Sequence, residues 1–479
     1  MGLVQTRVAW AALLVWSGLL AGPAGAQPLP AFPGAEGFGA GASGGRGGTL
    51  LKVTTLAATG AGSLQWALNQ PGPRFIVFAV SGVIAGDVHI PHGDVTLAGQ
   101  TAPGAGLTIN GHLYTTYGGA YGNIIIRHLR VRAPPADAQW PPAQHDAIQF
   151  STVHTWILDH VDVSHGIDEN VDLWGGAADV TVQWSAITFP VYGGGHPDGP
   201  AHNYGLLAGP GGGRISIHHN LFVHTKARTP ALAEGPADVI NNVVYNGREG
   251  FVHHNPVNGD FNIAGNLYLD GPSASLAPLW FDPENDPPPS RYWVWDNLVE
   301  DPGVYLGRVD NPFTTPGFDA AYGFYCCGIT AGQFNSVGEF DFSSHPGYVP
   351  VTRSAPAVAL DAVLDHAGAW PRDIVNTWAV TETQARSGSW GDRRPADWLE
   401  GLVPGVPPPD ADNDGMADAW EQAHGLDPSD GSDHATVMPS GYTAIEEYVN
   451  GLADLLIGGP LFADGFEGGD VGRWTGSVP

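Results

Sequence analysis

The sequence contains few cysteines and few positively charged side chains. Its two cysteines, Cys326 and Cys327, are neighbours, so no framework of disulfide bonds can join distant parts of the chain. They are left as a vicinal disulfide or as two thiols that are free or touch a metal. With 19 lysines and arginines against 48 aspartates and glutamates, the net charge is −29, which argues against nucleic acid and anionic membranes as partners. An anionic substrate would need local positive charge from a bound cation, an arginine or both.

Long apolar runs are absent after the first 26 residues. Residues 1–26 have the pattern of a secretory signal peptide, with Arg7 before an apolar core at 8–20 and a small-residue cleavage site at Ala24–Ala26. The apolar core is too short for a comfortable membrane span. We therefore expect an exported, soluble mature chain with no membrane span, secreted outside the cell or into the periplasm.

Helical periodicity is nearly absent between residues 75 and 300, where short β-rich segments recur instead. Stacking these segments in register puts seven polar residues in one column, at intervals of 32, 25, 35, 22, 24 and 31 residues: His128, His160, Ser185, Asn220, Asn242, Asn266 and Asn297. Strand-like units of this length predict a solenoid. We expect an all-β chain whose main domain is a right-handed parallel β-helix, with the asparagines bonded along the stack. A sandwich and a propeller remain alternatives, although a propeller would have more even intervals.

Carboxylates crowd the stretch from residue 146 to residue 174, between β-forming and aromatic residues. They are Asp146, Asp159, Asp162, Asp168, Glu169 and Asp172. Separated carboxylates that a fold returns to one place suit a hard divalent cation, which binds several oxygen ligands. The alternative is a solvated acidic edge that prevents strands of different molecules from pairing.

Several motifs occur in an order that resembles a known family. They are FPGAEGFGAGASGGRGG (32–48), WILDH (156–160), DENVDL (168–173), HNYGLLAG (202–209), HHNLFVHTKARTP (218–230) and INNVVYN (240–246). Together they resemble the exported bacterial pectate lyases of the parallel β-helix polysaccharide lyase superfamily. Each motif alone is only modestly specific, but the ordered combination over residues 31–300 is strong.

The resemblance implies a calcium site and a catalytic base. It places Ca²⁺ on Asp159, Asp168 and Asp172, with Asp146 as a weaker fourth candidate, and it makes Arg228 the base. Arginine is normally always protonated, so this role comes from the resemblance alone. From the residue itself, Arg228 could equally pair with a carboxylate or clamp the substrate.

Other basic residues near this motif are candidates for binding the substrate. Lys226 could bind a substrate carboxylate or be an exposed turn lysine, and His202 could contact substrate or be a structural histidine. Relatives often carry a further arginine after the proline, where this chain has Ala231. Arg130 and Arg132, or Arg248, could compensate for that missing arginine. Arg46 is expected to order the first coil.

The C-terminal part of the chain changes in composition. We expect the β-helix domain to occupy 27–402, with 301–400 forming loops at its end, followed by a Pro-rich linker at 403–409. An EF-hand-like calcium module is expected at 410–455, with a tail at 456–479. The module resembles dockerin-like or thrombospondin-type calcium modules, which leaves docking to a partner as a further alternative.

The pattern D-x-[DN]-x-[DN]-G-x5-E defines the expected ligands of this module. They are Asp410, Asp412, Asp414, the carbonyl of Met416, and Glu421. The alternative is an acidic loop without metal. Residues 441–452 have the apolar periodicity of an amphipathic helix.

The function predicted from these patterns is a monomeric, secreted, Ca²⁺-dependent pectate lyase. It would cleave the acidic plant cell-wall polysaccharide homogalacturonan, in its de-esterified form, by β-elimination. The alternatives are a lyase for another uronate polymer or for methylated pectin, and a non-catalytic β-helical protein that binds carbohydrate or lies on a cell surface. The non-catalytic alternative predicts an Arg228 that is buried against a carboxylate and closed off from the groove.

Overall fold

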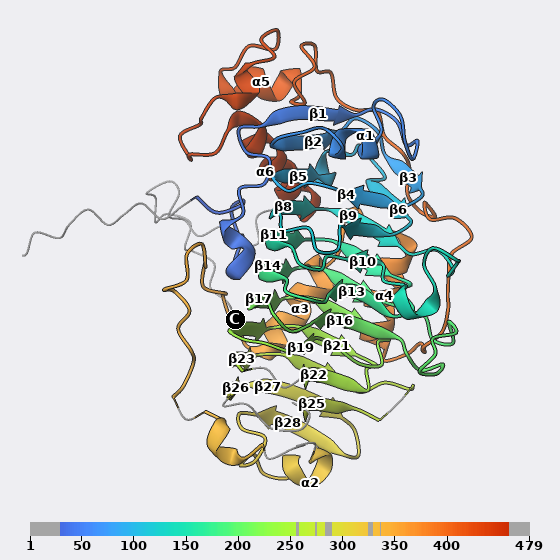
Figure 1. Cartoon of the computed structure of the whole chain (residues 1–479), viewed down its shortest axis with the longest axis vertical. Helices are drawn as coiled ribbons and strands as arrows, with labels where there is room; N and C mark the ends of the chain where they lie inside the picture. Colours follow the sequence, from blue (N-terminus) through green and yellow to red (C-terminus); the bar gives the residue numbers. More distant parts are fainter. Residues whose placement is uncertain are drawn as a thin grey trace, which may run out of the picture.

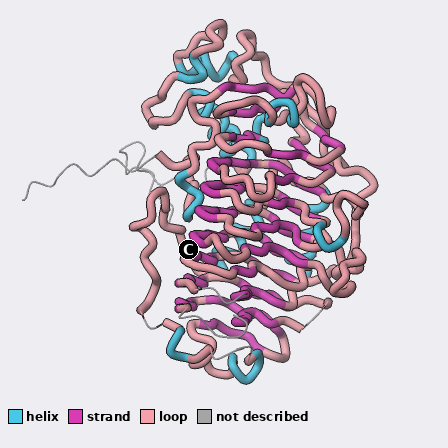
Figure 2. Tube along the Cα trace, viewed as in Figure 1, coloured by secondary structure: helices cyan, strands magenta, loops and turns pink. Residues whose placement is uncertain are grey.

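The computed structural model describes residues 29–254, 258–273, 275–282, 290–323, 329–335 and 337–458. The predicted signal peptide, Cys326 and Cys327, and residues 459–479 of the predicted tail lie outside the described residues. The described chain winds through three long sheets that surround a common interior, giving an elongated solenoid (Figures 1 and 2). Adjacent strands are parallel except for the final pair. The predicted parallel β-helix is therefore confirmed.

Each coil contributes a strand to each sheet, so residues distant in sequence become neighbours between coils. The first sheet consists of β1 (Thr49–Val53), β2 (Arg74–Phe78), β5 (Val95–Ala98), β8 (Gly122–Arg127), β11 (His154–Asp159), β14 (Ala178–Gln183), β17 (Gly213–His218), β20 (Ala237–Ile240), β23 (Asp260–Ala264) and β26 (Arg291–Trp295). The second consists of β3 (Gly82–Ala85), β6 (Leu107–Asn110), β9 (Leu129–Arg132), β12 (Asp162–Ser164), β15 (Ala186–Thr188), β18 (Leu221–Val223), β21 (Val243–Tyr245), β24 (Leu267–Leu269), β27 (Asn297–Asp301) and β28 (Tyr305–Val309). The third consists of β4 (Val88–Ile90), β7 (Leu113–Thr115), β10 (Ile148–Gln149), β13 (Glu169–Leu173), β16 (Tyr204–Ala208), β19 (Ala231–Leu232), β22 (Glu249–His254) and β25 (Ala277–Asp282).

Helices lie outside the solenoid or at its ends. The α-helices are α1 (Leu64–Leu68), α2 (Phe318–Tyr322), α3 (Pro356–His366), α4 (Ile374–Ala385), α5 (Asp418–His424) and α6 (Ala444–Leu456). The 3-10 helices are η1 (Phe38–Gly41), η2 (Gly99–Thr101), η3 (Pro142–Gln144), η4 (Ala331–Gln333) and η5 (Asp433–Ala435).

The interior is filled by apolar side chains that stack on one another from coil to coil. In the first sheet, Ile124, Trp156, Val180 and Ile215 are direct register partners and are all buried. Alternate residues of a strand point to the same face, so one apolar position per strand builds a continuous column. Complete burial of each such side chain contributes about 1.5–3 kcal/mol, which is why the register between coils is well defined.

The predicted polar column is correct for its later members. The side-chain oxygens of Asn220, Asn242, Asn266 and Asn297 accept hydrogen bonds from the backbone N–H groups one coil earlier, at 2.9–3.1 Å, beginning at Ser185. Each amide nitrogen also donates to a backbone carbonyl at 2.8 Å. These asparagines satisfy the backbone at the turn between the first two sheets, as predicted.

The two histidines of that predicted column belong to the neighbouring one. His128 and His160 align with Trp184 and His219, one residue before the asparagine positions, and all four have positive φ angles of 47–54°. Their rings form a stack, with centroids 4.9 Å apart for His128 and His160 and 4.4 Å apart for Trp184 and His219. The sequence alignment was therefore one residue out of register at these two positions.

The N-terminal segment, which contains the first of the family motifs, crosses the outer face of the first sheet. Phe32 and its alanine neighbours pack on Ile125 and Ile157, and the Gly39 N–H donates to Thr181 at 2.9 Å. A Cβ atom at Gly39 would lie 2.2 Å from the Trp156 carbonyl oxygen, so only glycine fits this close crossing. The glycines of this motif thus allow the N-terminal backbone to lie close to the first sheet.

Residues 301–400 do not form only loops at the end of the solenoid, as predicted. Helices α3 and α4 return along the second sheet, where Val363, Val375 and Ala379 pack against outward side chains such as Leu221 and Val243. The apolar outer positions of the second sheet require such a cover, and this requirement was not recognised in the sequence.

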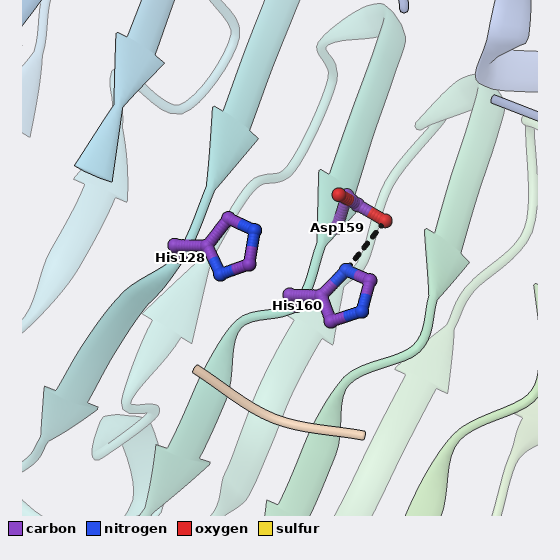
Figure 3. A group of neighbouring side chains, drawn as sticks. All are labelled: His128, Asp159 and His160. Atoms are coloured by element: carbon purple, nitrogen blue, oxygen red, sulfur yellow. Dashed lines mark ion pairs between the residues drawn. The ribbon is translucent and has the colours of Figure 1, made fainter. Parts of the chain in front are cut away.

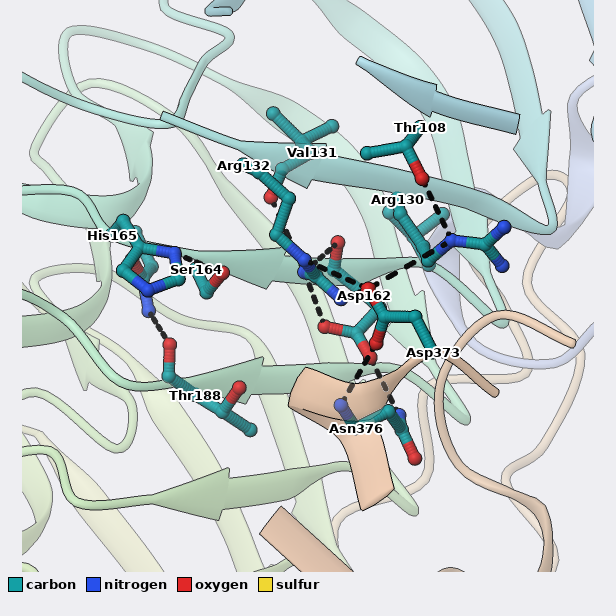
Figure 4. Close-up of polar contacts among 12 residues, drawn as sticks. Thr108, Arg130, Val131, Arg132, Asp162, Ser164, His165, Thr188, Asp373 and Asn376 are labelled. Carbon is teal, nitrogen blue, oxygen red and sulfur yellow. Dashed lines mark hydrogen bonds and ion pairs between the residues drawn. The ribbon is translucent and has the colours of Figure 1, made fainter. Parts of the chain in front are cut away.

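A buried ionic network joins α4 to the second sheet (Figure 4). Arg132 pairs with Asp162 at 2.6 Å and with Asp373, the N-cap of α4, at 2.8 Å. Arg130 donates to Thr108 at 2.9 Å and, like Arg132, is completely buried. Arg130 and Arg132 therefore cannot replace a missing substrate-binding arginine, and Asp162 is a network member rather than a solvated residue.

The C-terminal segment packs on the first coils of the solenoid (Figure 1). The predicted amphipathic helix is present as α6, whose Ile445 and Val449 lie in one apolar cluster with Phe75 and Val77 of β2. Polar contacts add to this packing, since Arg46 pairs with Glu446 at 2.7 Å. Residues 410–455 are thus docked on the β-helix and do not hang from a free linker.

No helix within the described ranges is both long enough and apolar enough to cross a membrane.

Candidate active site

Coil stacking brings four distant segments together where strands of the third sheet begin. Glu169 of β13 is the register partner of Tyr204 of β16, and Tyr204 in turn forms an isolated bridge with Ala227. On the other side, the backbone of Glu169 accepts a hydrogen bond from the N–H of Ala147 at 3.2 Å. Asp146 and Arg228, which precede and follow these bridging residues in the chain, are therefore carried to one site.

Three carboxylates form the acidic part of this site. Oxygen atoms of Asp146, Asp168 and Glu169 lie within 4.8 Å of one another, and we call these residues the acidic trio. The Glu169 N–H donates to Asp146 Oδ1 at 2.9 Å. Burial raises the pKa of Asp146 well above its usual value, and the charges of Asp172 and Asp168 act in the same direction. Three carboxyl groups are thus held close together, with Asp146 and Glu169 buried and Asp168 partly exposed.

Asp172 lies beside the trio, further along β13. Burial raises its pKa to about 7, the charge of Asp168 also raises it, and the hydrogen bond from the Trp174 N–H opposes the shift. Because Asp172 raises the pKa of Asp146, the two carboxylates share one electrostatic environment. Asp172 is part of the site although it is not a member of the trio.

Arg228 provides the positive charge of the site. Its guanidinium donates to Glu169 Oε1 and lies over the ring of Tyr204, 4.4 Å from the centroid. Burial lowers the pKa of Arg228 below the usual arginine range, while Asp168, Glu249 and Asp146 oppose that shift. The side chain retains 20% of its exposure. Arg228 is therefore paired with a carboxylate but is not closed off from solvent.

Lys226 and His202 both contact Tyr204, which lies against Arg228. Lys226 Nζ is 3.4 Å from the Tyr204 hydroxyl, and the His202 ring packs at a tilt against the Tyr204 ring with centroids 3.9 Å apart. His202 Nε2 is also 2.8 Å from Asp168 Oδ1, and the His202 ring stacks on the His196 ring with centroids 3.4 Å apart. Both predicted substrate-binding residues thus belong to the same site.

The predicted grouping of Asp159 with Asp168 and Asp172 is wrong. Asp159 ends β11 on the first sheet, where it pairs with Arg127 at 2.8 Å and with His160 at 3.0 Å (Figure 3). Burial alone would raise its pKa, but His160 and Arg127 hold the pKa below its usual range.

The surroundings of Asp159 explain why it does not belong to the candidate active site. Its partner Arg127 is covered by the ring of Phe32, 3.8 Å from the centroid, and donates to Asn450 of α6 at 2.9 Å. The WILDH motif therefore marks a buried structural contact between the first sheet, the N-terminal segment and α6.

Comparison with known proteins identifies the family, although no family model matches the chain. It is 33% identical over 439 residues to a probable pectate lyase C of Aspergillus fumigatus, covering 88% of this chain and 94% of the relative. It is 32% identical over 443 residues to a probable pectate lyase C of Aspergillus terreus, with the same coverage. The chain belongs to the pectate lyase family. These relatives are fungal, whereas the motifs had suggested bacterial ones.

The chain is also similar to two solved structures of pectate lyases. One, from Bacillus sp. N165 in complex with trigalacturonate, is 14% identical, with a TM-score of 0.43 and coverage of 70% of this chain and 99% of that chain. Another, of a pectate lyase from Paenibacillus sp. 0602, is 14% identical with a TM-score of 0.47, covering 72% and 98%. Family membership rests on the curated relatives, and it confirms the predicted enzyme class, a polysaccharide lyase.

The acidic trio of this pectate lyase fits a hard divalent cation. Its donors are all carboxylate oxygens, the type that Ca²⁺ prefers, and no sulfur ligand is present among them. With Asp172, four carboxylates face the single guanidinium of Arg228, which leaves negative charge unbalanced at a largely buried site. A bound cation would balance it. The residues that would hold the cation are Asp146, Asp168 and Glu169, with Asp172 beside them.

Three residues of the lyase site were missed or undervalued in the sequence. Glu169 was listed among the crowded carboxylates but not among the predicted calcium ligands, although its position next to Asp168 was the available signal. Tyr204 directly follows the HN pair of the HNYGLLAG motif but was not considered. His196 lies in a Gly- and Pro-rich loop without a motif, so only the structure shows that it stacks on His202.

The second predicted cation loop is also assembled. Oxygen atoms of Asp410, Asp412 and Asp414 lie within 4.8 Å of one another, and so do those of Asp414, Glu421 and Asp433. Burial raises the pKa of Glu421 to about 7 and that of Asp414 to about 6, and neighbouring carboxylates add to both shifts. Asp433, which lies outside the predicted loop, was not foreseen.

Proposed function

We propose that this pectate lyase cleaves de-esterified homogalacturonan by Ca²⁺-dependent β-elimination, with Arg228 as the base. The observation that carries the proposal is the direct ion pair of Arg228 with Glu169, a member of the all-oxygen acidic trio. Arg228 touches the acidic trio through Glu169, and this proximity supports an elimination in which base and cation act on a single sugar ring.

The chemistry explains why both charges are needed. The C5 proton of a uronate is weakly acidic, because its removal builds negative charge beside a carboxylate that is already negative. Ca²⁺ on that carboxylate supplies a Lewis acid that stabilises the developing charge. Arg228 would take the C5 proton, the electron pair left behind would form the C4=C5 double bond, and the C4–O4 bond would break, with the departing oxygen protonated by water. A base of high intrinsic pKa suits such a poor acid once part of it is neutral. Burial, which lowers its pKa, favours the neutral form.

Glu169 links the two parts of this mechanism. It contacts Arg228, which favours the charged guanidinium, and it also belongs to the acidic trio. Glu169 would be one of the residues that hold the cation, and it also pairs with Arg228. The ring of Tyr204 lies against the guanidinium and keeps it in place.

Lys226 and His202 would bind substrate beside the base. Both contact Tyr204, so a uronate chain along the third sheet would meet them within one sugar of Arg228. The net charge of −29 repels an acidic polymer at long range, and salt screens this repulsion beyond roughly 10 Å. Local positive charge from Lys226, Arg228 and the cation would then decide binding.

The rival functions are distinguished by specific features of the site. Methylated pectin would carry no charge for the cation to bind, so the acidic trio would have no role. The non-catalytic alternative predicted an Arg228 that is both paired with a carboxylate and closed off. The first half is met through Glu169, but the side chain remains 20% exposed, which favours the enzyme.

Secretion is part of the same proposal. Residues 1–26 carry the signal-peptide pattern, and homogalacturonan is an extracellular polymer. We expect the mature chain to begin at Gln27 and to act as a monomer, which intact-mass measurement and analytical ultracentrifugation of the exported protein would test.

The central experiment is digestion of polygalacturonate, followed by ultraviolet absorbance of the unsaturated uronate ends. We expect absorbance to rise with calcium and not with excess chelator, with little activity on highly methylated pectin and none on alginate. New reducing ends without absorbance would indicate hydrolysis and would overturn the elimination mechanism.

Substitution of the base sharpens this experiment. Arg228→Ala should lower the rate roughly a hundredfold or more, the range of general base catalysis, and Arg228→Lys should lie between. Arg308→Ala is the matched control, because that arginine is 62% exposed and pairs with Asp296 at the far end of the solenoid. Wild-type rates in Arg228→Ala would remove Arg228 from the mechanism.

A further inference from the structure

A group of buried carboxylate oxygens at the C-terminal end of the described chain has no hydrogen-bond partner there. They are Oδ2 of Asp412, Oδ2 of Asp414, both oxygens of Glu421, and Oδ1 of Asp433. Glu421 is completely buried and Asp414 is 2% exposed. Since a buried carboxylate without partners is costly, this convergence points to a missing positive ligand.

The other oxygens of the loop are occupied in a way that aims these free ones inward. The N–H groups of Asp414 and Gly415 donate to the two carboxylate oxygens of Asp410, each at 3.0 Å. The Met416 N–H donates to Asp414 Oδ1 at 2.9 Å. Gly415 has a φ of 87°, which makes the sharp turn that glycine alone adopts easily.

We propose that a calcium-class divalent cation binds Asp412, Asp414, Glu421 and Asp433, and that it clasps the C-terminal segment onto the first coils of the solenoid. The ligands come from two parts of the chain, the loop that ends in α5 and the 3-10 helix η5, rather than from the 410–421 loop alone. Asp410 stays at the edge of this site, because its carboxylate also pairs with Lys52 of β1.

Asp433 extends the effect of the cation beyond the loop. It begins η5, and its backbone carbonyl accepts a hydrogen bond from the Thr436 N–H at 2.8 Å. The Thr436 carbonyl in turn accepts from the N–H of Ala444, the first residue of α6, at 2.8 Å. An ion that fixes Asp433 therefore fixes the chain that leads directly into α6.

The loop side of the site reaches the solenoid through apolar packing. Met416 is buried in one cluster with Phe75 and Val77 of β2 and with Tyr448 of α6. One cation would thus hold together α5, η5 and the surface on which α6 docks. The same packing covers the apolar face of α6, so docking to a separate partner protein through that face is disfavoured.

Calorimetric titration of the full-length protein with CaCl2 tests the clasp. Asp433→Asn and Glu421→Gln should each weaken one calcium site by about tenfold or more, because each removes a charged ligand. Asp430→Asn is the matched control, since it removes the same charge from an exposed position of the same segment. Asp168→Asn should leave this site intact and so separates it from the proposed catalytic site.

Hydrogen exchange, measured on the wild type and on Asp433→Asn, gives a second test. Calcium should slow exchange in β1, β2 and α6, and Asp433→Asn should lose this protection at the same calcium concentration. Wild-type affinity and protection in Asp433→Asn would overturn the two-segment ligand set. If the Asp168→Asn variant bound no calcium at all, the C-terminal site would be overturned, whatever the outcome for the lyase activity.

Discussion

The two acidic clusters of the molecule are built from the same residue type but differ in what faces them. In the candidate active site, the guanidinium of Arg228 contacts the acidic trio through Glu169, so one carboxylate is already partly neutralised. In the C-terminal cluster, the oxygens of Glu421 have no partner among the described residues. The difference teaches that a neighbouring arginine, and not the number of carboxylates, distinguishes the proposed catalytic cluster from the proposed structural one.

The largest effect that this comparison predicts comes from removing a ligand in each cluster. At a fixed, limiting calcium concentration, Asp168→Asn should lower polygalacturonate cleavage by about a hundredfold, at the upper end of the loss caused by disturbing a metal site. The increase in melting temperature caused by calcium should persist in this variant. Rates of cleavage and calorimetric melting curves measure both quantities.

Glu421→Gln should show the reverse pattern, losing the calcium-dependent melting shift and keeping its cleavage rate below the melting range. If one substitution abolished both properties, the two clusters would not be independent, and the comparison would fail.

A smaller effect is expected where Glu169 joins the trio to Arg228. Glu169→Gln removes one trio charge and weakens the contact with the guanidinium, so calcium should bind the acidic trio about tenfold less tightly. The cleavage rate should therefore fall at limiting calcium and return most of the way to the wild-type rate at saturating calcium. Calcium titrations of the rate measure the shift, and Glu300→Gln, an exposed partner of Arg386, is the control. An unchanged calcium dependence would remove Glu169 from the cation site.

Asp238, a buried carboxylate outside both clusters, should make the stability of the fold depend on pH. Burial raises the pKa of Asp238 to about 6, although hydrogen bonds from Asn262, Tyr348 and Ser216 oppose the shift. A raised folded-state pKa means that Asp238 contributes stability at low pH, and that this contribution is lost as the pH rises toward about 6. The loss amounts to about 3 kcal/mol at most.

The variant Asp238→Asn imitates the protonated side chain, so it should flatten this dependence. Denaturant unfolding in chelator at pH 4, 5, 6 and 7, on the wild type and the variant, would measure the difference in slope. Equal slopes would show that Asp238 does not titrate in this range.

The smallest effect concerns the contact between the C-terminal segment and β1. Lys52→Ala removes the ion pair with Asp410, whose side chains are 15% and 13% exposed, and should lower the free energy of unfolding by about 1 kcal/mol. Arg386→Ala, which breaks a more exposed pair, should cost less. A loss of several kcal/mol in Lys52→Ala would instead indicate that Lys52 supports the cation site directly.

The fold could be predicted because its signal is repeated. A short strand followed by asparagine recurs from coil to coil, and each repeat supports the same register, as Asn242 and Asn266 show. The alignment failed at His128 and His160, where the same turn carries aromatic residues one position earlier and no asparagine follows. His128 and His160 are polar residues at the end of a strand, like the asparagines, but they lie one position earlier in the turn.

Residues of the candidate site could be predicted only where they belong to sequence motifs that lie on coils in contact with each other. Arg228, Lys226 and His202 lie together because the coils that carry them are adjacent. Asp159 was misplaced because sequence order does not reveal which sheet a residue belongs to, and the covering N-terminal segment and α6 lie far away in the chain. Asp433 was missed for a different reason, because the pattern covers only residues 410–421 and Asp433 lies after it.

The contact between Arg46 and Glu446 joins residues 400 positions apart, which has a consequence for biosynthesis. During translation the first coils emerge long before α6, so the apolar outer face of β2 stays uncovered until residues 444–456 have been made. A nascent or truncated chain that stops before residue 444 would expose Phe75 and Val77 to other molecules. Affinity tags therefore belong after residue 458, and C-terminal truncation should cause aggregation before it affects catalysis.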